Sequence, residues 1–191
     1  AYDVTDYINY DKDNVIVVRA DATQYEGWFY EGAGIYRHVW LNQYNNTHIA
    51  TDGVFVSTDV NGAGAKMNIE TTVQNDDLSS SACTVYNYIT NREGKKLAQT
   101  KEQNLQLSVN EKGVIKQQTT LINPKLWSLE DPYLYRLITI VKQGGKTIDS
   151  ATTKFGVRTI TIKPDGVYLN GTHIKIKGTN NHQDHAGVGS A

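Results

Sequence analysis

The stretch Lys66-Met67-Asn68-Ile69-Glu70-Thr71-Thr72-Val73 alternates polar and apolar side chains. Successive side chains of a β-strand point to opposite faces of a sheet, so this pattern predicts a strand with one buried face. The segment 84–89 repeats the alternation, and strands are also predicted at 114–121, 134–141 and 148–155, which are rich in Val, Ile, Thr and Tyr. These residue types suit a pleated, half-buried surface. The sequence therefore predicts an all-β protein.

Turn chemistry separates these segments. Asn61-Gly62, Glu93-Gly94, Lys112-Gly113 and Gly144-Gly145 are all suited to tight turns. From about residue 45 to 157 the spacing predicts roughly seven strands, as in an immunoglobulin-like β-sandwich. No segment carries a sustained apolar stripe at helical spacing, so we expect little helix beyond a turn or two near Val4–Ile8.

The two ends of the sequence are less complete than its middle. Residues 1–43 supply two or so strands, including a buried one at Val15–Val18, and residues 159–191 supply a short hairpin at 167–174 and a polar tail. Neither end could bury a core of its own. We therefore expect a fragment of a larger protein. Its strands at 15–20 and 35–42 should pair between chains, pack on the sandwich or be poorly ordered, because unpaired strand edges recruit partners.

Composition disfavours several classes of protein. The net charge is -1 and no run of Lys or Arg is longer than Lys95-Lys96, which disfavours nucleic-acid binding. The apolar stretches are short, which disfavours a membrane span. The single cysteine, Cys83, allows no intramolecular disulfide and no cysteine-built metal site, and we expect it to be a small buried strand residue.

A cluster of aromatic residues, glycines and charges fills Glu26–Leu41, beginning Glu26-Gly27-Trp28-Phe29-Tyr30. Aromatic rings can stack on the apolar face of a sugar, and carboxylates accept hydrogen bonds from its hydroxyls. The alternative is structural: the aromatics fill the seam between two β-domains. Residue types alone favour the structural role.

Residues 123–135 form a second motif, Asn123-Pro124-Lys125-Leu126-Trp127 through Asp131-Pro132-Tyr133-Leu134-Tyr135. The two prolines fix the chain before the next strand, and we expect Leu126 and Trp127 to be buried. A neighbouring Asn110-Glu111 pair could suggest catalysis, but its position before Lys112-Gly113 predicts a hairpin turn instead.

The tail segment 178–187 is dense in hydrogen-bonding side chains. His182, Asp184 and His185 could suggest a metal site, although this spacing is common in solvated loops. The alternative is a substrate-binding loop after a strand of a (β/α)8 barrel, where the active sites of such barrels lie.

Four motifs together resemble glycoside hydrolase family 2, nearest its β-galactosidase branch. They are GAGIYRHVWL at 32–41, NPKLWSLEDPYLY at 123–135, FGVRTI at 155–160 and LNGTHIKIKGTNNHQDH at 169–185. Each is moderately specific, and their order and spacing over nearly the whole chain strengthen the match. The resemblance implies the C-terminal part of a sugar-binding jelly-roll domain at 1–43, the immunoglobulin-like domain at 44–158 and the start of the catalytic TIM barrel at 159–191.

The resemblance also implies a chemistry. The family contains retaining exo-β-glycosidases that cleave terminal β-linked sugars with two glutamates, whose carboxyl groups lie about 5–5.5 Å apart. In the family both glutamates lie on later barrel strands, so we expect this chain to be an inactive scaffold between the sugar-binding and catalytic domains.

By resemblance, four residues would touch the substrate in the full enzyme. His182 matches a histidine that contacts sugar hydroxyls, and Asn180 and Asp184 share its loop. Glu26 stands where β-galactosidases usually have an aspartate that reaches the substrate and, in some members, a sodium ion. The family often uses Mg and Na, while no cofactor is expected within this chain.

Other readings stay open from the sequence. One is a free-standing carbohydrate-binding β-sandwich module, and another is a cell-surface adhesion sandwich, which the tail motif disfavours. The expected partner is a carbohydrate substrate reached through the full enzyme, with no nucleic acid, no membrane and possible strand pairing between chains. The sequence leaves the compartment open between bacterial periplasm and cytoplasm, and it leaves the sugar and the oligomeric state undetermined.

Overall fold

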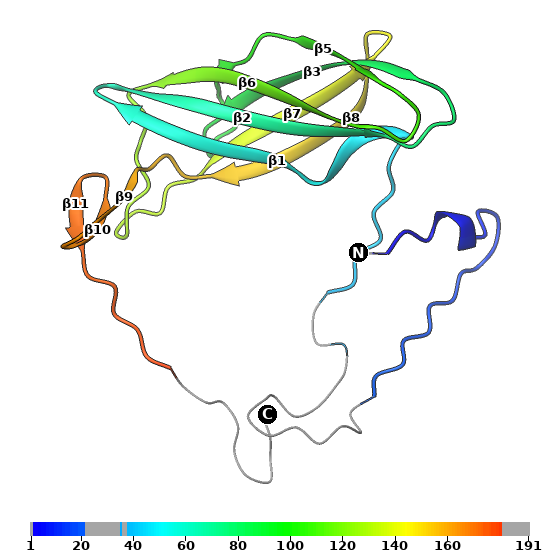
Figure 1. Ribbon diagram of the computed structural model, residues 1–191, viewed down its shortest axis with the longest axis horizontal. Helices are drawn as coiled ribbons and strands as arrows, with labels where there is room; N and C mark the ends of the chain where they lie inside the picture. Colours follow the sequence, from blue (N-terminus) through cyan, green and yellow to red (C-terminus); the bar gives the residue numbers. More distant parts are fainter. Residues whose placement is uncertain (1, 22–34, 36–37, 181–191) are drawn as a thin grey trace. The chain divides into compact units, whose positions relative to one another are not determined.

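The computed structural model describes residues 2–21, 35 and 38–180. It divides into two compact units: residues 42–177, and a second formed by residues 1–41 with 178–191. The strands of the described residues all lie in the first unit (Figure 1). The second contains a short 3-10 helix at Thr5–Tyr7, within the segment where a helical turn was predicted.

The first unit is an antiparallel β-sandwich, which confirms the all-β prediction. One sheet has the order β1 (Thr47–Asn61), β2 (Gly64–Asn75), β6 (Lys112–Ile122). The other has the order β4 (Lys96–Gln99), β3 (Ser81–Thr90), β7 (Tyr135–Gln143), β8 (Lys146–Phe155), with β5 (Gln103–Leu107) also paired to β3. The two sheets form the layers seen in Figure 1, with β1 and β8 as edge strands.

Side-chain alternation explains the burial of the sandwich. Along β2, Met67, Ile69, Thr71 and Val73 are buried, while the residues that alternate with them keep contact with solvent. β3 alternates in the same way, and Cys83 on it is a free, buried thiol, as predicted. Period-two alternation therefore gives each sheet one inner face for the shared core.

A belt of polar side chains crosses the middle of this core. It consists of Thr71 on β2, Asn87 on β3, Gln117 on β6 and Thr139 on β7, all at most 5% exposed. Asn87 lies between Val85, which belongs to one buried apolar cluster, and Ile89, which belongs to the other. This polar belt therefore separates the two apolar clusters of the core.

Hydrogen bonds satisfy most of the polar belt. The Asn87 Nδ2 donates to Gln117 Oε1 at 2.7 Å, and the Thr139 hydroxyl donates to Asn87 Oδ1 at 2.5 Å. The Gln117 Nε2 donates to the carbonyls of Val85 and Lys101. Thr71 Oγ1 is a buried oxygen without a hydrogen-bond partner among the described atoms. Such networks are stabilising when complete and costly when broken.

The turns agree with the sequence in three of the four predicted places. Gly62, Gly94 and the pair Gly144-Gly145 have positive φ angles, which glycine adopts without strain. The prediction of a turn at Lys112-Gly113 was wrong, because both residues lie inside β6. The predicted hairpin turn at Asn110-Glu111 is a turn between β5 and β6, which belong to different sheets and do not pair, so it is not a hairpin.

The prolyl motif at 123–135 closes one end of the sandwich. The Lys125 backbone N–H donates to the Tyr135 hydroxyl at 2.8 Å, which ties the motif to the first residue of β7. Leu126 packs against the apolar cluster that contains Tyr135, but Leu126 and Trp127 are both half-buried rather than buried as predicted. The structural role predicted for this motif is thereby supported.

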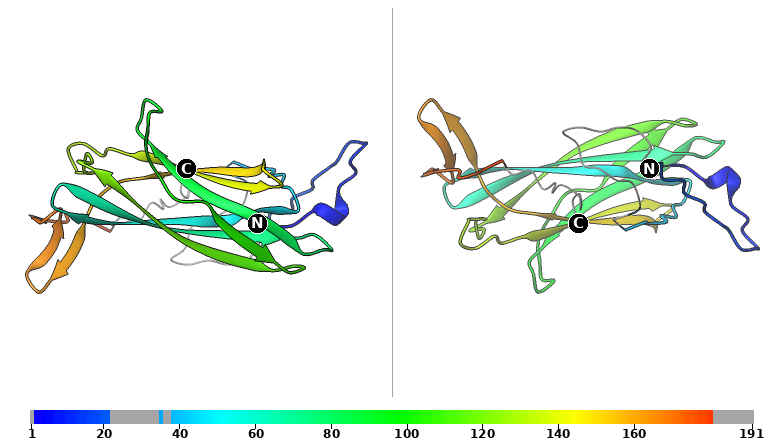
Figure 2. Two further views of the ribbon diagram at one scale, coloured as in Figure 1. Left: turned by 90° about the horizontal axis from the view of Figure 1, so that it is seen from above. Right: turned by 90° about the horizontal axis from the view of Figure 1, so that it is seen from below.

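A three-stranded meander follows the sandwich. It contains β9 (Ile160–Lys163), β10 (Gly166–Leu169) and β11 (Thr172–Ile174), and β10–β11 is the hairpin predicted at 167–174. Its turn uses Asn170 and Gly171, both with positive φ. Figure 2 shows this meander, in orange, extending beyond the end of the sandwich.

The prediction of a buried strand at Val15–Val18 was wrong for this chain. These four side chains are 59–87% exposed, and the segment is in no strand. Residues 38–42 likewise form no strand. A β-rich sequence still needs a partner for its backbone hydrogen bonds, and none of the described strands pairs with either segment.

Candidate functional site

Most of the sugar-binding residues expected from the sequence lie outside the described residues. Glu26, His182 and Asp184 are in this group, so their geometry stays a prediction. Asn180 is described, and it is exposed in a segment without regular structure. Its one recorded contact is a long hydrogen bond of 3.4 Å that its carbonyl accepts from the Thr179 hydroxyl.

The segment that precedes Asn180 is anchored to the sandwich at Asn170. The Asn170 Nδ2 donates to the Trp127 carbonyl at 2.9 Å, and its Oδ1 accepts from the Thr159 N–H at 3.0 Å. Its own N–H donates to the Thr159 carbonyl at 2.9 Å. One side chain in a left-handed turn thus joins the meander, the strand-to-meander junction and the prolyl motif.

Trp127 and the segment 156–158 pack tightly on one another. The Trp127 N–H donates to the Val157 carbonyl at 2.8 Å, and the Arg158 guanidinium lies 4.9 Å from the Trp127 ring centroid. A Cβ atom on Gly156 would lie 2.8 Å from Trp127 Cδ1, closer than packed atoms permit. The motifs at 123–135 and 155–160, about 30 residues apart in sequence, therefore form one junction.

The meander carries a small polar cluster around Tyr168. Its hydroxyl donates to Asp165 Oδ2 at 2.5 Å, Lys163 Nζ lies 4.1 Å from its ring centroid, and the His173 ring is 5.1 Å away. The hydrogen bond to Asp165 raises the pKa of Tyr168, so the phenol stays protonated at neutral pH. This cluster holds the hairpin together rather than offering a base.

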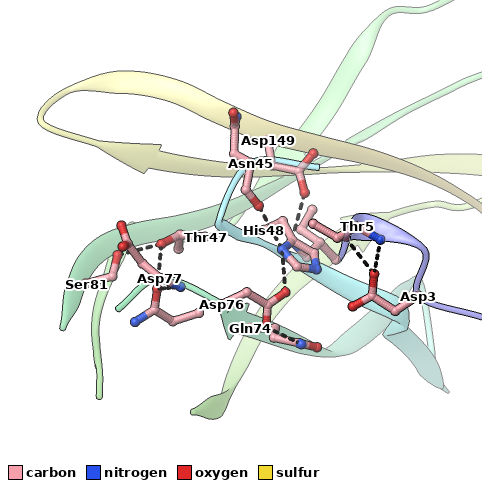
Figure 3. Close-up of polar contacts among 12 residues, drawn as sticks. Asp3, Thr5, Asn45, Thr47, His48, Gln74, Asp76, Asp77, Ser81 and Asp149 are labelled. Carbon is pink, nitrogen blue, oxygen red and sulfur yellow. Dashed lines mark hydrogen bonds and ion pairs between the residues drawn. The ribbon is translucent and has the colours of Figure 1, made fainter. Parts of the chain in front are cut away.

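His48, at the start of β1, is the buried histidine that the sequence did not single out (Figure 3). Its Nδ1 lies 2.9 Å from the Asn45 carbonyl and 3.8 Å from Asp76 Oδ2, and its ring stacks on Tyr44 at 4.6 Å. Nearby, Asp149 accepts a hydrogen bond of 2.7 Å from the Ile49 N–H. With 6% of His48 exposed, a substrate has no route to it, so these contacts fasten β1.

Three acidic groups in the described part of the chain have a resolved pKa shift, and none of the three matches a general acid. A glycosidase acid needs a raised pKa so that it is protonated at working pH. The pKa of Asp131 is lowered by its hydrogen bond with Lys125, that of Glu111 by the Ser108 N–H, and that of Asp3 by Thr5. Every carboxyl with a resolved shift among these residues is thus shifted the wrong way.

Residues 2–21, 35 and 38–180 contain no group of three or more His, Cys, Asp or Glu side chains arranged to hold a metal ion. Within these ranges, no helix has the length and apolar character needed to cross a membrane.

Comparison with known proteins places this junction in context. Residues 47–158, more than half of the chain, match the family described as glycosyl hydrolases family 2. The chain is 35% identical, over all of its length, to 23% of a β-galactosidase (BoGH2A) of Bacteroides ovatus. It is 31% identical, again over all of its length, to 29% of a β-glucuronidase of Bacteroides fragilis.

The solved structures give the same relationship. A glycosyl hydrolase family 2 member from Bacteroides cellulosilyticus superposes with a TM-score of 0.87 and 31% identity, covering 98% of this chain and 26% of that one. The chain thus spans about a quarter of the length of these relatives.

Proposed function

The chain belongs to glycosyl hydrolase family 2, and from this premise we propose that it is a non-catalytic scaffold segment of a retaining exo-β-glycosidase. The proposed parent activity is β-galactosidase-like hydrolysis of terminal β-linked sugars, in keeping with the name of the B. ovatus relative. The segment would hold a sugar-binding domain and a catalytic barrel in a fixed position relative to each other.

The junction at Asn170 is the observation that carries the scaffold role. Its side chain bonds to both Trp127 and Thr159, so the meander leaves the sandwich from a fixed point. A rigid connection positions catalytic groups better than a flexible one, because misplacement by about 1 Å can cost about a hundredfold in rate. The tail that bears Asn180, His182 and Asp184 follows this junction directly.

We place both catalytic glutamates outside these 191 residues. The chain spans about a quarter of the length of its relatives, and Glu111, the one glutamate of the described residues with a resolved shift, has a lowered pKa. Glu26, Asn180, His182 and Asp184 would then contact sugar hydroxyls without taking part in bond cleavage. Any Mg or Na ion would be held mainly by residues of the longer protein.

The longer polypeptide provides the test of this proposal. It should hydrolyse a nitrophenyl β-galactoside, and replacing either of two barrel glutamates by glutamine should abolish turnover while leaving the fold intact. A parent gene that encodes no such pair of glutamates would refute the proposal of a retaining glycosidase.

A free-standing carbohydrate-binding module is the second candidate. Trp40 supports it, because this aromatic side chain is 76% exposed and available for stacking on a sugar. Calorimetric titration of the chain with a β-galactoside separates the two candidates. The scaffold proposal predicts no measurable heat of binding, whereas a module would bind without the barrel.

A further inference from the structure

An open hollow of about 450 Å³ lies on the sandwich between two of its edge strands, β1 and β8. Val56 and Thr58 from β1 form one side, and Lys154 and Phe155 from β8 the other. Leu134 and three residues of the segment that leads into the meander, Gly156, Arg158 and Ile160, complete it. Its volume is within the range of about 300–1,000 Å³ that small-molecule sites occupy.

The charged side chains that line the hollow are all positive. Lys154 and Arg158 both line it, and no acidic residue does. Lys154 also lies directly opposite Arg136 across the β7–β8 pair, an arrangement of like charges that destabilises a sheet. None of the ion pairs formed within residues 2–21, 35 and 38–180 includes any of these three cations.

Two lysines elsewhere on the outer faces of the sandwich are neutralised. Lys116 pairs with Glu70 at 3.0 Å on the three-stranded sheet, and Lys142 pairs with Glu102 at 2.8 Å on the other. An anion bound in the hollow would relieve the repulsion between Lys154 and Arg136.

The apolar wall and the fixed backbone add shape to this charge. Phe155 is 8% exposed, whereas Ile160 is 59% exposed and offers an uncovered aliphatic surface. The Thr58 hydroxyl donates to the Arg158 carbonyl at 2.8 Å and accepts from its N–H at 3.3 Å. With the Arg158 guanidinium also held over Trp127, little ordering is needed when a ligand binds.

We propose that this hollow binds a sugar acid, meaning a uronic acid or the uronic acid residue of a short saccharide. The carboxylate would accept charge-assisted hydrogen bonds from Lys154 and Arg158, and the apolar face of the sugar ring would pack on Ile160. The inference goes beyond the proposed glycosidase function and rests on the hollow alone.

The test is a titration of the 191-residue chain, labelled with ¹⁵N, with galacturonate, galactose and acetate in separate experiments. Galacturonate should shift the amide signals of residues 56–58 and 154–160, with a dissociation constant on the order of millimolar. Galactose lacks the carboxylate and acetate lacks the ring, so each should bind at least about fivefold more weakly. Added salt should weaken galacturonate binding.

Two substitutions on β8 provide a matched pair. Lys154→Gln should weaken galacturonate binding at least about fivefold and should raise Tm by about 1–4 °C, because it removes the like-charge pair. Lys146→Gln, at the opposite exposed end of the same strand, should change neither quantity. Ile160→Ser tests the apolar wall and should weaken galacturonate without affecting acetate.

Several results would overturn the inference. One is the absence of amide signal shifts at about 50 mM galacturonate, well above the expected dissociation constant. Another is binding of galactose or acetate as tight as that of galacturonate. Equal losses in the Lys154→Gln and Lys146→Gln variants would also overturn it, since binding would then depend on net charge rather than on the hollow. Equal binding of inorganic phosphate would indicate a general anion site and would refute the sugar-acid assignment.

Discussion

Replacing Asn87 by alanine should destabilise the sandwich more than any ordinary surface change, because Asn87 is the centre of the polar belt. Its side chain is fully buried and makes two side-chain hydrogen bonds, one to Gln117 and one from Thr139. Alanine would remove both bonds and leave their partners inside the core.

The size of the effect follows from what is left unpaired. Gln117 Oε1 and the Thr139 hydroxyl make no other described hydrogen bond, and each unsatisfied buried group costs about 1–3 kcal/mol. A water molecule entering the vacated volume would recover part of this loss. We expect the free energy of unfolding to fall by about 2–5 kcal/mol.

Urea unfolding followed by tryptophan fluorescence and circular dichroism measures this loss. Asn104→Ala is the matched control, since Asn104 is exposed and accepts one hydrogen bond from Thr84, so the expected loss is below about 0.5 kcal/mol. Thr71→Val removes the unpartnered buried hydroxyl and should be neutral or stabilising by up to about 1 kcal/mol. A loss of less than about 1 kcal/mol for Asn87→Ala, with an unchanged m-value, would refute the argument that the polar belt depends on complete pairing.

Three further predictions concern other parts of the chain. Asn170→Ala should raise the rate of amide hydrogen exchange throughout the meander and leave exchange in the sandwich core unchanged, because it removes the hydrogen bond to the Trp127 carbonyl. Equal exchange rates in the meander of Asn170→Ala and wild type would contradict the anchoring role. Lys125 lowers the pKa of Asp131, so the stabilisation from the Asp131 carboxylate is present above its unfolded pKa and is lost as the pH falls through the folded pKa. Thermal melts should therefore show Asp131→Asn less stable than wild type at pH 6 but nearly equal to it at about pH 2. A stability difference that stays constant with pH would refute this linkage. Cys83 is 4% exposed and burial raises its pKa, so a thiol reagent at pH 8 should label it only as fast as the protein opens; rapid labelling of the folded chain would disprove its burial.

Alternation of side chains predicted the long strands of the sandwich because burial on one face leaves a period-two signature. β1 escaped individual prediction because it contains a register shift around Asp52 and Gly53, where a Cβ on Gly53 would lie 2.6 Å from the Ala50 carbonyl oxygen. Gly113 was misread as a turn residue for a related reason. Its Cβ would lie 2.7 Å from a Leu107 methyl group, so this glycine serves close packing within a strand.

The sites were less predictable because they depend on contacts between distant segments. The hollow forms where Thr58 meets Arg158, 100 residues later in the sequence, and no local spacing records that meeting. The role of Asn170 was hidden in the same way, since a residue in a turn gave no sign of its bond to Trp127. The family motifs, by contrast, carry their information in order and residue type, which a sequence displays directly.

The most direct test of the central claim is hydrolysis of a nitrophenyl β-galactoside by the purified 191-residue chain, measured beside the longer protein. The scaffold account predicts turnover by the longer protein and none above the blank for the chain, although circular dichroism shows the chain folded. Turnover by the chain that persists through repurification would contradict the account, because the catalytic carboxyl groups would then lie within these residues.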